Sequence, residues 1–427
     1  MKSLAVVLIG GMMVTGTGCL DAAGDTSEAT EASEASEATE ASQAEQAGSF
    51  EEVVARHCDR NNRLPNNVPV RDESGMFTTM SSQGFIDLDN EFFQDLGGNG
   101  RRCVSCHVPS VGWTITPHQL QETFEETDGG AYDDGLGLGA VFRTNDGANS
   151  PKADVSTKAK RRQAYSMLLN RGLVRVGLPV PANAEFELVA VDDPYHYASA
   201  AELSLFRRPL PTTNLKFDST VMWDGREVVP GATVASELET QASDAVIGHA
   251  QGKSLTSAQR ESIAQFETSL ASAQIYDHQA KDLYAAGAEG GPSEILAQEF
   301  YIGINDNFGD SKTLAPFTSN VFTIFNRWAK AEGPHAEARR AIARGQQIFN
   351  SHPIAISGVS GINDEAKFGK PATLMGSCSS CHNTPNGGNH SVVAPLNIGL
   401  VDASRRTKDM PLYTLRNKTT GETVQVT

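Results

Sequence analysis

The chain has 427 residues and a formal net charge of −17, with 39% hydrophobic, 20% charged and 7% aromatic residues. Its length predicts two or more domains, and its composition is that of a globular protein able to bury a sizeable core. The negative charge argues against nucleic acid and anionic membrane surfaces as partners, and it favours a basic partner protein.

The segment 1–19 has the pattern of an export signal. Lys2 precedes an apolar run over residues 4–14, which is too short to span a bilayer. Cys19 follows Gly16-Thr17-Gly18 and resembles the acylation site of a bacterial lipoprotein. Signal cleavage near the same point without lipidation is the alternative. In both cases we expect export to the periplasm or cell envelope, with membrane attachment through a lipid anchor only.

The segment 20–48 is acidic and of low complexity. Glu-Ala-Thr/Ser units repeat without large apolar residues, and six Glu fall within residues 28–45 with no Lys or Arg. Such a segment cannot bury a core. We expect an extended tether behind a lipidated Cys19, or simply a disordered N-terminal tail.

The pentapeptide Cys-x-x-Cys-His occurs twice, as Cys103-Val104-Ser105-Cys106-His107 and as Cys378-Ser379-Ser380-Cys381-His382. It is the attachment signature of c-type haem. The two thiols add across the porphyrin vinyl groups, and the His supplies an axial nitrogen to iron. Two complete copies in a chain of six cysteines predict two covalent haems. A zinc site built from one cysteine pair of each half is the alternative, although zinc does not require the adjacent His.

The folded part predicts a mainly α protein with two cytochrome c-like domains and long loops. An N-terminal domain with a large insertion would cover residues 49–285, and an incomplete C-terminal domain would cover residues 286–427. The glycine-rich stretch 285–291 marks the boundary.

Apolar spacing predicts helices over residues 158–169, 257–270 and 335–350. The last of these precedes the second haem motif, and residues 90–96 precede the first. We therefore expect these two segments to be the opening helices of the cytochrome c folds. Stretches rich in Gly, Asn, Asp and Pro predict loops at residues 128–154 and 357–371.

With these motifs, the chain resembles the bacterial di-haem cytochrome c peroxidases and their relative that matures methylamine dehydrogenase, over about residues 75–427. The further matching segments are Met222-Trp223-Asp224-Gly225-Arg226, Gln241-Ala242 and Ala343-Arg344-Gly345-Gln346-Gln347-Ile348-Phe349. A large-insert subgroup is most similar, through Asn99-Gly100-Arg101, Gly248-His249-Ala250 and Asn386-Gly387-Gly388-Asn389-His390. The resemblance implies that the C-terminal haem takes electrons from a small cytochrome or copper protein. The N-terminal haem would then reduce hydrogen peroxide, and relatives are often homodimers.

Trp223 matches the tryptophan that lies between the two haems in this family. An aromatic ring between two redox centres also provides a packed route for electrons. A core aromatic, with Asp224 and Arg226 paired beside it, is the alternative for Trp223. Arg226 is a candidate to stabilise developing negative charge, and a structural ion pair is equally consistent with its sequence context.

Peroxide cleavage needs a group that moves a proton between the two oxygens. The family has a Gln and a Glu about ten residues apart on the distal side of the peroxidatic haem, and Gln241 matches the Gln. No Glu stands at the matching place, and His249 is the nearest titratable residue. Three roles stay open for His249: an acid–base group near neutral pH, a sixth ligand to iron, or neither.

The distal ligand of the second haem has two candidates, His390 and Met410, because the family places a Met or His after the second motif. Capping of a loop is the alternative role of His390. Relatives continue beyond the position of Thr427 with a segment over the C-terminal haem, so a natural truncation and a fragment are both open. An interdomain calcium ion is usual in the family, but its ligands cannot be assigned, because Arg207-Arg208-Pro209 stands where an Asn would help.

Two classes of function follow. The first is an enzyme, a di-haem peroxidase that passes electrons from the C-terminal haem through Trp223 to the N-terminal haem. The second is a non-enzymatic electron carrier in which both irons have six ligands. A di-haem oxidase or a protein-maturation enzyme would share the architecture of the first class.

Overall fold

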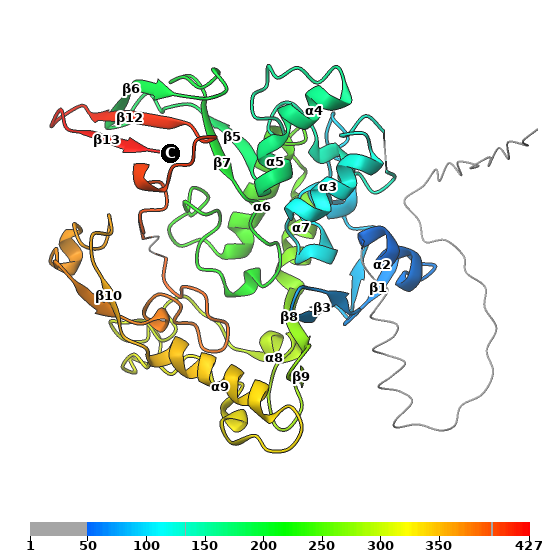
Figure 1. The fold of residues 1–427 in the computed structure, drawn as a ribbon, viewed down its shortest axis with the longest axis vertical. Coiled ribbons are helices and arrows are strands. Elements are labelled where there is room, and N and C mark those ends of the chain that lie inside the picture. The colour runs from blue at the N-terminus through cyan, green and yellow to red at the C-terminus, as the bar shows by residue number, and fades with distance from the viewer. Residues whose placement is uncertain (1–48, 133, 394–395) are drawn as a thin grey trace, which may run out of the picture.

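The computed structural model describes residues 49–132, 134–393 and 396–427. The predicted export signal (1–19) and tether (20–48) lie outside the described residues. Figure 1 shows an upper part, coloured blue to green, and a lower part that carries α8 and α9. The chain then returns to the upper part, where its last strands lie.

The expected mainly α fold is wrong. Helices account for 30% of the structure and strands for 17%, in several small sheets. The α-helices of the described residues are α2 (Phe50–His57), α3 (Pro117–Glu126), α4 (Lys158–Ala164), α5 (Ser166–Arg171), α6 (Val234–Gly248), α7 (Ser257–Ser269), α8 (Pro292–Ala297) and α9 (Ala336–Ser351). The strands are β1 (Arg63–Pro65), β2 (Val70–Arg71), β3 (Gly75–Ser81), β4 (Phe85–Asp87), β5 (Val174–Leu178), β6 (Phe186–Asp192), β7 (Leu203–Arg207), β8 (Leu270–Asp277), β9 (Lys281–Asp282), β10 (Ile354–Ile356), β11 (Leu374–Gly376), β12 (Leu412–Asn417) and β13 (Thr423–Val426).

The strands escaped prediction because they are short and several of their partners are distant in the chain. Gly75 of β3 lies opposite Asp277 of β8, and Leu412 of β12 lies opposite Asp192 of β6. Strand stability depends on cross-strand neighbours rather than on spacing within one segment. Apolar spacing within one segment therefore does not indicate these strands.

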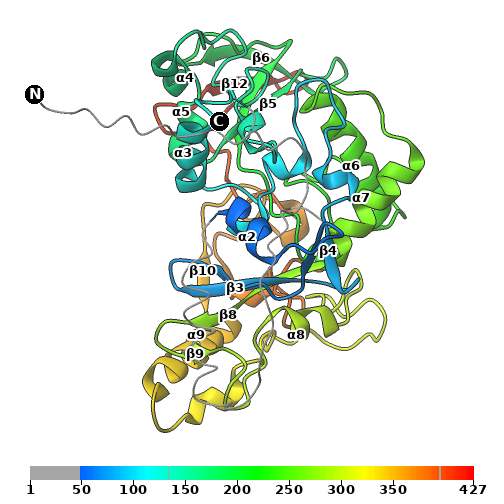
Figure 2. The same cartoon turned by 90° about the vertical axis from the view of Figure 1, so that its right-hand side faces the viewer.

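A four-stranded antiparallel sheet, in the order β2-β3-β8-β9, crosses the middle of the molecule. In Figure 2, β3 and β8 run between the helices of the upper part and the lower part with α8 and α9. The hydroxyls of Thr79 and Ser272 lie 2.7 Å apart across this sheet, and those of Ser81 and Ser269 lie 3.0 Å apart. The sheet tolerates buried polar side chains because they satisfy one another.

Beside this sheet lies an aromatic core whose ring centroids are 5.2 to 6.5 Å apart in tilted or edge-to-face contacts. The rings belong to Phe92, Phe93, Trp113 and Phe266. Trp113 donates its indole N–H to Thr79 Oγ1 at 2.9 Å, which fixes the core against β3. The Phe92 ring lies 6.3 Å from the His107 ring, so this core supports the first haem motif.

The structure confirms two predicted helices, as α7 and α9. The segment 158–169 is helical but is interrupted at Tyr165 between α4 and α5. The predicted opening helix at residues 90–96 is wrong, because only a 3-10 turn forms there, over Glu91–Phe93. Asn90 caps that turn through the N–H of Phe92, and both Phe rings turn into the core, so the helix does not continue.

The helices α6 and α7 pack against each other beside the first haem motif. Each begins with a capping box, in which a Thr hydroxyl accepts a backbone N–H and the third helical residue bonds back. The caps are Thr233 for α6 and Thr256 for α7. The two capping boxes and the packing of α6 on α7 fix which face of α6 lines the cavity described below.

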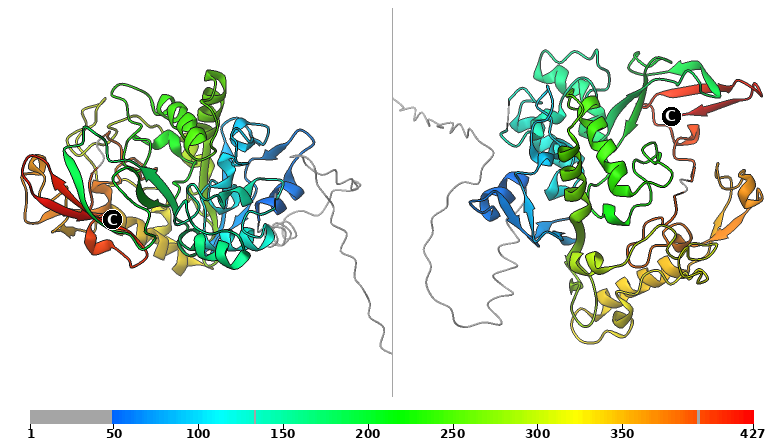
Figure 3. Two further views of the ribbon diagram at one scale, coloured as in Figure 1. Left: turned by 90° about the horizontal axis from the view of Figure 1, so that it is seen from above. Right: turned by 180° about the vertical axis from the view of Figure 1, so that it is seen from behind.

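The last two strands complete a three-stranded sheet in the order β13-β12-β6. The views from above and behind in Figure 3 both place these red strands beside green strands, of which β6 pairs with β12. Tyr413 of β12 is buried, and its hydroxyl bonds the N–H and C=O of Ser204 at 2.8 and 2.9 Å. The end of the chain is therefore tied to the segment between the two haem motifs, and the predicted boundary at 285–291 stays a prediction.

None of the helices within the described residues is long and apolar enough to cross a membrane.

Candidate haem sites

One cavity in the upper part brings together residues from widely separated segments, and we call it the N-terminal cavity. It holds about 1470 Å³ of empty space, including its mouth. All seven residues that the sequence predicted for the first haem and its chemistry line it: Cys103, Cys106, His107, Trp223, Arg226, Gln241 and His249.

The first motif forms a 3-10 turn over Cys103–Ser105. The His107 N–H bonds the carbonyl of Cys103 at 3.0 Å, so the His follows the turn directly. His107 Nδ1 lies 3.2 Å from the carbonyl of Trp113. Since a carbonyl can only accept, Nδ1 carries the proton and Nε2 has a free lone pair. Iron-ligating histidines are held in this way.

Burial sets the protonation of the first motif. It lowers the pKa of His107 to about 4, assisted by His249 and opposed by the Trp113 carbonyl. The imidazole is therefore neutral at pH 7, as a metal ligand must be. Burial also raises the pKa of Cys106 to about 11 and the pKa of Cys103 further above its ordinary value. Both thiols are consequently protonated.

The wall of the cavity opposite the motif is one face of α6. Residues at helical spacing line it, namely Leu238, Gln241, Ala242, Ala245 and His249. Gln241 is half-buried, and His249 caps the C-terminal end of α6. The structure thus brings together both of the residues that the sequence proposed for peroxide chemistry.

His249 is held by a buried ion pair. Its Nδ1 lies 2.6 Å from Asp146 Oδ2, and Arg101 forms an ion pair with the other oxygen of Asp146. The Arg101 and Asp146 side chains are 3% and 8% exposed. Burial raises the pKa of Asp146, but Arg101 and His249 outweigh it and hold the pKa below its ordinary value. A carboxylate can only accept, so His249 donates its Nδ1 proton to Asp146, and Nε2 is the nitrogen left for another partner.

Close backbone approach makes this contact possible. A Cβ on Gly97 would lie 2.0 Å from the carbonyl of Ala250. The N–H of Gly98 donates to that same carbonyl at 2.8 Å. Arg101 and Asn99 then donate to the His249 carbonyl at 3.1 and 2.8 Å. The loop before the first motif is thus fastened to the end of α6.

Trp223 lies on the cavity wall and is 38% exposed. The guanidinium of Arg207 lies over its ring, 4.2 Å from the centroid, in a cation–π contact. Arg226 pairs with Asp224 through Nε at 3.0 Å, so the structural ion pair considered for Arg226 is present. Arg226 also lines the cavity, which keeps its guanidinium near any ligand there.

Three carboxyl groups on the cavity wall were missed from the sequence. Asp146 lies in a predicted loop and carried no pattern. Asp218 lies in the irregular segment after β7. Glu267 is 4% exposed, its Oε2 lacks a hydrogen-bond partner, and burial raises its pKa to about 8. Its helical spacing from Ile263 and Leu270 was the available signal, since it places a carboxyl on an apolar face.

The second motif repeats the local geometry of the first. It forms a 3-10 turn over Cys378–Ser380, and the His382 N–H bonds the carbonyl of Cys378 at 3.0 Å. His382 Nδ1 lies 2.9 Å from the carbonyl of Gly388, six residues later in the chain. The Trp113 carbonyl, which contacts His107 Nδ1, also lies six residues after its histidine. The Phe349 ring of α9 lies 6.0 Å from the His382 ring, matching the contact of Phe92 with His107.

The surroundings of the second motif are more open. His382 is exposed, and Cys378 and Cys381 are half-buried. Burial raises the pKa of Cys381. Ser379 is fully buried and donates its hydroxyl to the carbonyl of Asn350 at 3.0 Å, which ties the motif to the end of α9.

The two predicted distal ligands of the second haem lie in different places. His390 Nδ1 bonds the carbonyl of Cys381 at 3.0 Å, and its Nε2 is buried without a partner. The hydrogen bond from Nδ1 holds the His390 ring against the backbone of the second motif and ties the loop that carries His390 to that motif. Met410 lies in the turn before β12, where its N–H bonds Thr407 and its carbonyl accepts from Arg406.

The residues of the N-terminal cavity fit a c-type haem. The paired thiols and the orientation of His107 meet its needs. Arg102 Nε is buried on the wall without a hydrogen-bond partner, which suits a carboxylate such as a haem propionate. Within the described residues, no group of three or more His, Cys, Asp or Glu side chains is placed to hold a metal ion, so the two cysteine pairs are not gathered into one site here. The predicted calcium ion gains no ligand set from these side chains.

No protein-family model, no curated protein and no solved structure matches this chain. Its function therefore has to be inferred from the geometry and chemistry of the two motifs and the cavity.

Proposed function

We propose that this chain is an exported di-haem c-type oxidoreductase that reduces hydrogen peroxide to water. One observation carries the proposal: a single cavity gathers the first Cys-x-x-Cys-His motif with Trp223, Arg226, Gln241 and His249. The matching geometry of the two motifs supports a second haem at Cys378, Cys381 and His382. Attachment of c-type haem after export agrees with the N-terminal sequence pattern, including a lipid anchor at Cys19.

His107 and His382 would each hold one iron through Nε2, while Cys103, Cys106, Cys378 and Cys381 would hold the porphyrins. Bound haem would supply the iron that binds peroxide and the path for its electrons. A small cytochrome or copper protein would donate those electrons at the second motif, which is the more exposed of the two. A homodimer and a bound calcium ion stay predictions from the resemblance.

His249 is the residue proposed to move the proton in the cavity. Asp146 holds its Nδ1 proton, so Nε2 can accept a proton from the near oxygen of peroxide and return it to the far oxygen. The Gln241 amide can donate a hydrogen bond to the same oxygens. Trp223 would carry electrons towards the cavity, and the Arg207 cation over its ring disfavours loss of an electron from the ring itself.

A second candidate function is supported by the same contact. A histidine whose Nδ1 is fixed by a carboxylate is also arranged as a metal ligand. If His249 Nε2 binds iron, the first haem has two histidine ligands and the protein is an electron carrier. The contact between His249 and Asp146 does not by itself separate these roles.

The test is a peroxide titration of the exported, haem-loaded and fully reduced protein, followed by visible absorption and electron paramagnetic resonance. Two haems per chain and rapid two-electron oxidation support the peroxidase. Slow, non-stoichiometric bleaching of two low-spin haems rejects it and leaves the carrier.

The variant His249→Ala separates the two functions. Loss of peroxide turnover with unchanged resting spectra supports the acid–base role, with an effect on the order of 10²–10⁴-fold. A new high-spin signal in the resting protein supports ligation of iron by His249. Asp244→Asn, a change on the exposed side of α6, is the control and should alter neither.

A further inference from the structure

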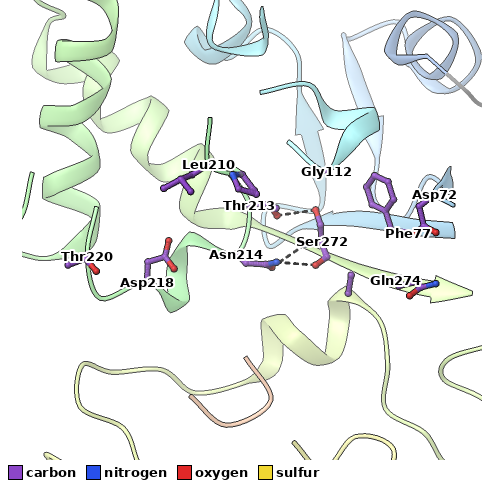
Figure 4. Close-up of a pocket in the computed structure, with 12 residues that line it drawn as sticks. Asp72, Phe77, Gly112, Leu210, Thr213, Asn214, Asp218, Thr220, Ser272 and Gln274 are labelled. Atoms are coloured by element: carbon purple, nitrogen blue, oxygen red, sulfur yellow. Dashed lines mark hydrogen bonds between the residues drawn. The ribbon is translucent and has the colours of Figure 1, made fainter. Parts of the chain in front are cut away.

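A second cavity, which we call the side cleft, lies next to the N-terminal cavity and opens to solvent. Its walls come from the turn before β3, from β3 and β8, and from residues 210–220, as Figure 4 shows. It holds about 1100 Å³ of empty space, including its open side. Four residues line both cavities: Leu210, Pro211, Asp218 and Thr220. The two cavities therefore share part of one wall.

Asp218 is the only titratable residue among these four. Its neighbours face the other way: Phe217 packs on Phe300 with ring centroids 6.1 Å apart, and Ser219 donates its hydroxyl to the carbonyls of His390 and Val392. The backbone at Asp218 is extended, so its side chain points to the opposite side from both neighbours. Figure 4 shows the Asp218 carboxyl beside Thr220 at one end of the side cleft.

Within the described residues, no side chain or backbone group forms a hydrogen bond or ion pair with the Asp218 carboxyl. Burial alone raises its pKa to about 7, and no neighbouring charge contributes. The charged or titratable groups on the two linings, besides Asp218, are Asp72 in the side cleft and Arg101, Arg102, Cys103, Cys106, His107, Asp146, Arg207, Arg208, Arg226, His249 and Glu267 in the N-terminal cavity. A carboxyl with a pKa near the pH of the solution both accepts and releases protons readily.

We propose that Asp218 is a proton relay between the side cleft and the N-terminal cavity. The proposal rests on the peroxidase function above. Reduction of one hydrogen peroxide breaks the O–O bond and consumes two electrons from the donor protein and two protons, giving two water molecules. Those protons must come from solvent, and Asp218 is the titratable side chain that lines both the open cleft and the cavity.

The proposal is tested with Asp218→Asn in the haem-loaded protein. Peroxide turnover at pH 7 should fall by about 100-fold, at the lower end of the range for a lost proton-transfer group. The solvent deuterium isotope effect on turnover should rise, because proton entry becomes rate-limiting. Asp218→Glu should restore much of the rate, and Asp244→Asn on the exposed side of α6 should behave like the unchanged protein.

An infrared difference spectrum between oxidised and reduced protein gives a second readout that does not depend on turnover. We expect a protonated-carboxyl band that shifts in D₂O and is absent in Asp218→Asn. Absence of this band from the unchanged protein overturns the relay, even if the Asn variant does not fold. Unaltered turnover and isotope effect in a folded Asn variant also overturn it and leave the peroxidase intact. No peroxide turnover in the unchanged protein instead rejects the peroxidase, and the relay with it.

Discussion

At the scale of single residues, the contact chain from Arg101 through Asp146 to His249 links the fold to the proposed chemistry. Arg101 and Asp146 are nearly inaccessible to solvent, while His249 is 44% exposed towards the cavity. Two buried charges of opposite sign stabilise each other, because each has lost its hydration and is compensated only by attraction to the other. The orientation of His249 therefore rests on a pair that also stabilises the fold.

Asp146→Asn removes the charge that balances Arg101. We expect the free energy of unfolding to fall by about 3–5 kcal/mol, the usual cost of breaking a buried ion pair from one side. Urea unfolding followed by circular dichroism measures it. Glu187→Gln is the matched control, since its ion pair with Arg416 is about half exposed and should contribute at most about 1 kcal/mol. Equal losses in the two variants would contradict the prediction.

Glu267 makes the stability of the protein depend on pH. Burial raises its pKa from 4.5 to about 8, so the folded protein keeps a proton that the unfolded chain releases between those values. The unfolded state binds fewer protons in that window, and stability therefore falls as pH rises, by up to ~1.4 kcal/mol per pH unit.

The variant Glu267→Gln keeps the shape of the side chain and removes its titration. Urea midpoints of both proteins at pH 5, 6, 7 and 8 should show a difference that grows in favour of the variant as pH rises. A difference that is constant over this range would mean that Glu267 is already ionised in the folded protein.

At the scale of elements, the position of α6 against the loop of the first motif decides the shape of the cavity. The loop at Gly97 and Gly98 touches the backbone at Ala250, and this contact leaves no room for a side chain. The capping box at Thr233 fixes where the helix begins, and the loop fixes where it ends. Gln241 and His249 face the cavity because both ends of the helix are held.

Gly97→Ala should disturb this contact, because the added Cβ would meet the Ala250 carbonyl at 2.0 Å. Overpacking of this kind costs about 1–3 kcal/mol, so the thermal midpoint should fall. Gly345→Ala in α9 is the control: no atom lies within 4 Å of its added Cβ, and a helical Gly→Ala change should stabilise by about 0.5–1 kcal/mol. Shifts of the same sign in both variants would contradict this account of Gly97.

At the scale of the whole molecule, the chain crosses between its two parts more than once. Ser219 contacts the loop after the second motif, and β12 returns to pair with β6, which lies between the two motifs in the chain. The segment between the two motifs therefore contacts two later segments, the loop after the second motif and β12. Electrons that move from the second motif to the first would cross this joined region.

Tyr413→Phe tests the return of the last strands. The change leaves the N–H and C=O of buried Ser204 without their partner, at a cost of about 1–3 kcal/mol. Limited proteolysis should then cut near residue 401 faster than in the unchanged protein. Tyr132→Phe is the control, since that side chain is 67% exposed and the loss of its hydroxyl should not change the cleavage rate.

Local signals in the sequence foresaw the parts of the site that are local in the chain. The two Cys-x-x-Cys-His motifs and the helices α7 and α9 followed from motifs and spacing, whereas Trp223, Gln241 and His249 were chosen through the resemblance to the di-haem peroxidases. The mainly α fold and the helix at residues 90–96 were wrong. In both cases distant partners decided the backbone: β8 and β12 for the strands, and the aromatic core for Phe92 and Phe93.

By itself, the sequence predicted two attachment sites for haem, because Cys-x-x-Cys-His is a contiguous motif that can be found without knowing any distant residue. Tertiary structure alone decided that Asp146 holds His249, that Glu267 is buried on the cavity wall, and that Asp218 lies between two cavities. A carboxyl group in the sequence carries no mark of its burial. Its pKa and its partners are set by packing between segments that are far apart in the chain.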